Sequence, residues 1–151
     1  MAVRRQQPED PLKQLLSSLG RGLWALIAWP FNGLGRSKPN EKLAQARAEF
    51  TAHWADIELM AATTGQQRQA IMQADILLDQ ALQFYKVSGQ TLGERLKAAG
   101  GRLSKETLDT AWRGHKVRNH LAHELRYELR GSEAEQALAD FKKVLRSLGL
   151  L

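Results

Sequence analysis

Apolar residues recur every three or four positions through most of the chain, which is the spacing of an amphipathic α-helix. The pattern predicts a first long helix at about 41–62, whose buried side consists of Leu43, Ala46, Phe50, Trp54, Ile57 and Leu59. The other predicted helices cover about 66–87, a short segment after Thr91, 105–129 and 133–148. Short connections between four substantial helices favour antiparallel packing. We therefore predict an all-α fold, an antiparallel bundle of four to five helices.

The connections in this bundle carry helix start and stop signals. Thr91 is followed by Glu94 three positions later, a capping box that starts a short helix. Glycine or serine stands at the other breaks, at 63–65, 88–89, 100–101 and 131–132. Helical spacing also predicts the core, and the residues expected to be buried are Leu77, Leu78, Val117, Leu121, Leu125 and Phe141.

The first 38 residues form a separate N-terminal extension, and 39–151 form the bundle. Leucines at helical spacing from Leu12 to Ile27 predict an amphipathic helix with basic residues around it. The uncharged stretch 22–35 is too short to cross a bilayer as one straight helix. Two interpretations remain open. The helix either lies in a membrane interface, with Trp24, Trp29 and Phe31 in contact with lipid, or docks segment 12–31 on the domain or on a partner protein.

Charge and cysteine content narrow the expected setting. The 151 residues include no cysteine, which excludes disulfides and cysteine-based zinc sites, so we expect a cytoplasmic protein. If the extension binds lipid, we expect the protein to be peripheral at the inner face of the membrane. The net charge of +6 favours an anionic partner, either nucleic acid or an anionic membrane. That charge is concentrated in the extension, where six basic residues oppose two acidic ones.

Candidate chemistry gathers in the predicted helix 105–129. His115, Asn119 and His123 are spaced by four and therefore share one helical face, flanked by Arg118 and Arg126. The apolar positions Val117, Leu121 and Leu125 follow the same spacing on a different face and are expected to be core. A histidine cluster of this kind serves metal binding, proton transfer or anion recognition.

The segment Arg118-Asn119-x-x-x-His123 resembles the signature of the HEPN superfamily, an arginine, a polar residue and a histidine four to six positions after the arginine. The stretches 74–79, 91–96 and 111–119 also look like those of an uncharacterised bacterial branch. The resemblance covers roughly 41–148. It implies a homodimer in which two motifs line one cleft and cleave RNA without metal or cofactor, as in a toxin or a stress- or defence-related nuclease.

By match to that motif, His123 would transfer protons, Arg118 would hold the phosphate, and Asn119 would orient the substrate or the catalytic pair. Imidazole exchanges protons near neutral pH, and guanidinium stays charged and binds phosphate oxygens with two arms. Further candidates for contact with RNA or phosphate are His115, Arg126 and Tyr127.

A non-catalytic interpretation stands beside this one. Many HEPN-like domains are pairing modules, and Asp75 or Asp79 on a neighbouring helix could form ion pairs with Arg118 or His115. The motif would then be a structural network in an interaction module, tethered to a membrane or a partner by its N-terminal helix. A zinc site built from His115, His123 and one aspartate is a lesser alternative.

Overall fold

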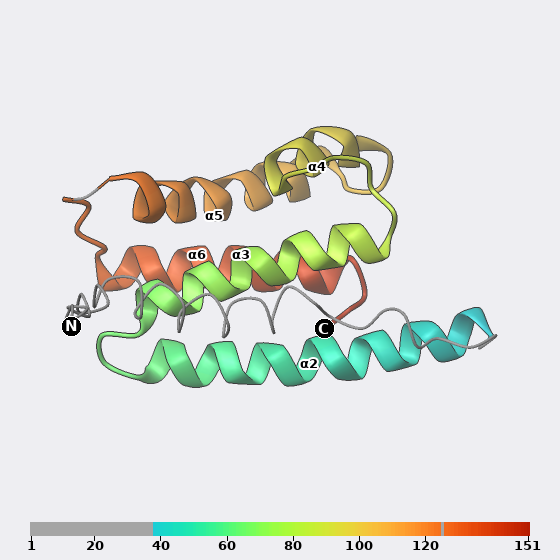
Figure 1. The fold of residues 1–151 in the computed structure, drawn as a ribbon, viewed down its shortest axis with the longest axis horizontal. Coiled ribbons are helices and arrows are strands. Elements are labelled where there is room, and N and C mark those ends of the chain that lie inside the picture. Colours follow the sequence, from blue (N-terminus) through green and yellow to red (C-terminus); the bar gives the residue numbers. More distant parts are fainter. Residues whose placement is uncertain (1–37, 125) are drawn as a thin grey trace, which may run out of the picture. The chain divides into compact units, whose positions relative to one another are not determined.

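The computed structural model describes residues 38–124 and 126–151, and this part of the chain is entirely helical, without a β-strand (Figure 1). In chain order the elements are α2 (Pro39–Ala62), α3 (Gln67–Phe84), α4 (Leu92–Ala98), the 3₁₀ turn η2 (Ala99–Gly101), α5 (Lys105–His123) and α6 (Gly131–Ser147). The long helices run alternately up and down and pack against one another. The predicted all-α bundle is therefore confirmed.

Helices α3 and α6 form the middle of the bundle, with α2 on one side and α5 on the other (Figure 1). Their facing side chains make the core, which includes the fully buried Ile71, Leu78, Leu82, Phe141, Val144 and Leu145. Of the residues predicted to be core, Leu77, Leu78, Leu121 and Phe141 are buried, Val117 is half-buried, and Leu125 lies outside the described residues. The prediction for Leu59 was wrong, because this side chain is 70% exposed while Ile57, two positions earlier in α2, is buried.

A glycine brings α5 and α6 into close contact. A Cβ atom placed on Gly114 would lie 3.0 Å from Cζ of Phe141, and the other ring carbons nearby are almost as close. Because Phe141 is completely buried, its ring has little freedom to move away. The absence of a side chain at Gly114 therefore sets how closely these two helices approach, and thereby how α5 sits on the bundle.

The prediction for the end of α5 was wrong. The helix stops at His123 instead of continuing to 129, and Glu124 takes an extended conformation with φ −105° and ψ 105°. Two carbonyl groups near this end, those of Leu121 and Tyr127, accept hydrogen bonds from Arg68 of α3. The chain then leads to α6, which begins at Gly131. Arg126 and Tyr127 consequently belong to a connector and not to the helical face of the motif.

Residues 1–37 of the predicted extension lie outside the described residues. The structure therefore does not test the predicted amphipathic helix at 12–31 or the predicted membrane contact of Trp24, Trp29 and Phe31. Within the described ranges, none of the helices combines the length and apolar character that a membrane span requires.

Candidate functional site

The histidine three positions before the motif is tied to the neighbouring helix. His115 is only 9% exposed, and its Nδ1 lies 2.7 Å from Oδ1 of Asp75, which is itself 4% exposed. On its other side, His115 meets the edge of the Trp112 ring at a centroid distance of 5.7 Å, and Gly93 of α4 approaches its Nε2. His115 is therefore an internal side chain with a committed partner, which leaves its ring little access to a phosphate.

The same aspartate holds the motif arginine. Nε of Arg118 lies 3.2 Å from Oδ2 of Asp75, close enough for an ion pair, although this buried nitrogen does not meet the geometry of a hydrogen bond. At the other end of the guanidinium, Nη1 donates to Oδ1 of Asn119 at 3.3 Å. The Arg118 side chain remains 28% exposed. Asp75 thus holds the buried Nε side of Arg118, while part of the arginine side chain reaches the surface.

Exposure increases along the motif toward the end of α5. Asn119 is half-buried and His123, the last residue of the helix, is exposed. His120 lies between them in sequence and is committed elsewhere, since its ring stacks on Tyr127 at 5.3 Å and its Nδ1 bonds to Glu124. The surface-accessible part of the motif therefore consists of Arg118, Asn119 and His123.

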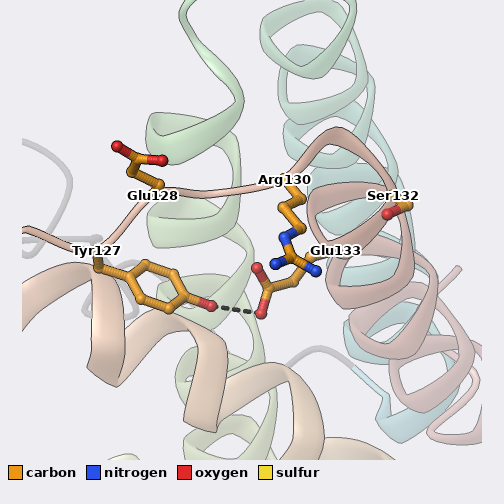
Figure 2. Close-up of a pocket in the computed structure, with 5 residues that line it drawn as sticks. All are labelled: Tyr127, Glu128, Arg130, Ser132 and Glu133. Atoms are coloured by element: carbon orange, nitrogen blue, oxygen red, sulfur yellow. Dashed lines mark hydrogen bonds between the residues drawn. The ribbon is translucent and has the colours of Figure 1, made fainter.

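Tyr127 sits in the connector that follows α5. Its hydroxyl donates to Glu133, as Figure 2 shows, and burial together with this hydrogen bond raises the pKa of Tyr127 to about 12. Beside it is an open pocket of about 380 Å³, which is lined by Tyr127, Glu128, Arg130, Ser132 and Glu133. Two carboxylates in this pocket disfavour a phosphate, and the hydroxyl of Tyr127 is already engaged. Arg126 is exposed in the same connector.

The two aspartates considered from the sequence behave differently. Asp75 contacts both His115 and Arg118, whereas Asp79 pairs with Arg95 at 2.6 Å and accepts a hydrogen bond from Gln83. Only Asp75 therefore belongs to the motif's network.

Arg68 is the residue that sequence reasoning missed. Its guanidinium binds the carbonyl of Leu121 at 2.8 Å and that of Tyr127 at 3.1 Å. The two acceptors lie 53 and 59 positions after Arg68 in the sequence. Every residue has a backbone carbonyl, so no residue type marks these two positions as acceptors. No pattern in the chain could have indicated them.

The described residues contain no group of three histidine, cysteine, aspartate or glutamate side chains able to hold a metal ion together. Comparisons of the chain with protein-family models, with curated proteins and with solved structures found no match. The geometry around α5 and the motif itself are therefore the features that bear on function.

Proposed function

We propose that the end of α5 binds RNA phosphate and that the protein is a metal-independent endoribonuclease, acting as a pair of chains. The observation that carries this proposal is the placement of Arg118. Buried Asp75 anchors its Nε side, while its partly exposed guanidinium shares a helix end with Asn119 and the exposed His123. An anchored cation and an exposed imidazole in the last two turns of one helix are the minimum equipment for phosphoryl transfer from RNA.

The reaction proposed is attack by a ribose 2′-hydroxyl on the adjacent phosphate. The 2′-oxygen forms a bond to phosphorus, the bond to the 5′-oxygen breaks, and a cyclic phosphate and a free 5′-hydroxyl result. His123 accepts the proton of the attacking hydroxyl or supplies the proton of the leaving oxygen, and a second chain provides the complementary histidine. Arg118 offsets the charge that develops on the phosphate, and Asn119 orients its guanidinium.

The test is cleavage of single-stranded RNA by the full-length parent, His123→Ala, Arg118→Ala and Lys116→Ala. We expect the first two substitutions to lower the rate by ~10²–10⁴-fold, because a proton carrier or a transition-state cation is lost. Lys116 is exposed on the same helix, and its substitution should leave the rate unchanged. Cleavage should persist in EDTA and leave a cyclic phosphate end. A parent without activity, or a fully active His123→Ala, would contradict the proposal.

A second candidate is a non-catalytic interaction module. The observation that favours it is the shared use of Asp75, which already provides His115 and Arg118 with an internal partner. In that case the motif residues serve the stability of the bundle. The expected pattern is an inert parent and an Arg118→Ala variant that differs from it only in stability, so RNA cleavage by the parent distinguishes the two functions.

A further inference from the structure

Helix α3 directs two side chains at α5. Arg68 and Asp75 are seven positions apart, which is close to two full turns, so they lie on one face of α3. Asp75 contacts His115, which precedes the motif, and Arg118, its first residue. Arg68 contacts the last turn of α5 and the connector beyond it. One face of α3 thus contacts both ends of the segment that carries the motif.

We propose that Arg68 is a positioning residue for His123, an inference that rests on the proposed function. The two arms of its guanidinium bind the carbonyl of Leu121, two residues before His123, and the carbonyl of Tyr127, four residues after it. His123 therefore lies in a short piece of backbone that one planar side chain holds on both sides.

The chemistry of a helix end explains why an arginine fits here. The last four carbonyl groups of a helix lack intrahelical donors and form the negative end of the helix dipole. Arg68 supplies a donor to one of these groups and a positive charge near the others. Lysine could not reproduce the contact, because its single ammonium group lacks the rigid fork that reaches two carbonyls at once.

Loss of this contact should affect the site more than the core. Arg68 is exposed and none of its hydrogen bonds above involves a buried core side chain. Without it, the last turn of α5 should open more often, since helix ends unfold locally at low cost. His123 would then move relative to Arg118, which Asp75 keeps in place. A displacement of ~1 Å in a catalytic group can cost ~10²-fold in rate.

The experiment uses full-length parent, Arg68→Ala, Arg68→Lys and Arg47→Ala. Arg47 is a matched control, because it too is an exposed arginine that donates to a backbone carbonyl, that of Gly149 at 2.5 Å. Amide hydrogen exchange is measured over 120–128, and kcat and KM are measured on single-stranded RNA. We expect Arg68→Ala to exchange faster there and to lose ~10–100-fold in kcat with little change in KM. Arg68→Lys should be intermediate, and Arg47→Ala should match the parent.

The outcomes separate this inference from the function on which it rests. An Arg68→Ala protein that keeps the parent's kcat, or its exchange rates over 120–128, overturns the positioning role. Equal losses in Arg68→Ala and Arg47→Ala overturn it as well, because they would reflect general stability. A parent that cleaves no RNA contradicts the endoribonuclease proposal and with it any role of Arg68 in cleavage. Faster exchange in Arg68→Ala would then support only the structural part, that Arg68 holds this helix end.

Discussion

Breaking the ion pair between Asp75 and Arg118 should lower the free energy of unfolding by a measurable amount. The losses caused by substituting the two residues singly should not add in the double variant. The Asp75 side chain is 6% exposed and the Arg118 side chain 28% exposed, so Asp75 depends more on protein partners than Arg118 does. Breaking a buried ion pair by deleting one member costs ~3–5 kcal/mol. Partial exposure lets water take over some of the contact, so we expect a loss of about 2 kcal/mol for Arg118→Ala.

Asp75→Ala should cost more, about 3 kcal/mol, because it removes the hydrogen-bond partner of His115 and the ion-pair partner of Arg118 at once. In the double variant the two losses overlap, and we expect a coupling of ~1–2 kcal/mol. Urea unfolding followed by circular dichroism at 222 nm measures these differences. A loss of 2 kcal/mol shifts the urea midpoint by roughly 1 M at a slope of ~2 kcal/mol/M.

Lys116→Ala is the control for this cycle, since Lys116 is exposed on the same helix, and its midpoint should stay at the parent value. A coupling near zero would refute the reasoning, because it would mean that Asp75 and Arg118 do not stabilise each other in solution. Arg118 would then be free for a ligand, and its substitution should affect RNA cleavage without affecting stability.

Three further predictions follow from other features. Gly114→Ala should lower stability by about 1 kcal/mol, because the clash with Phe141 outweighs the gain in helix propensity, and a thermal melt compared with the parent's checks this. The raised pKa of Tyr127, about 12, means that its neutral form stabilises the fold below pH ~10 and that this contribution is lost between pH ~10 and 12. Urea midpoints should therefore fall more steeply over that range in the parent than in Tyr127→Phe. The full-length chain should bind anionic vesicles at low salt through 12–31, and a chain starting at Lys38 should lose that binding while keeping its helical spectrum.

Periodicity was enough to predict the bundle, because each long helix shows the 3.6-residue repeat of a buried stripe. It failed at the end of α5, where the apolar spacing continues to Leu125 but the helix stops at His123. Near that end, Arg68 contacts backbone atoms more than fifty positions away. A tertiary contact of this kind leaves no trace in the apolar repeat.

The same limit of sequence patterns applies to the candidate site. Spacing by four correctly put the motif residues along one side of a helix, yet it could not tell that His115 is buried while His123 is exposed. Burial along this row depends on α3 and α4, which cover its first turns and leave its last one open. The pairing of Asp75 with His115 and Arg118 was among the possibilities open from the sequence. Which of the two aspartates pairs with His115 and Arg118 depends on how α3 is rotated about its axis and packed against α5.

The two anchors of α5 differ in what they recognise, and this has a consequence for sequence variation. Asp75 contacts the side chains of His115 and Arg118, so it constrains which amino acids can stand at those positions. Arg68 contacts carbonyl oxygens, which every amino acid possesses, so it constrains the path of the chain and not the identity of residues 121 and 127. In a library randomised at all of these positions, folded variants should retain Asp75 together with its two partners. They should also retain Arg68, whereas many different residues should be accepted at positions 121 and 127.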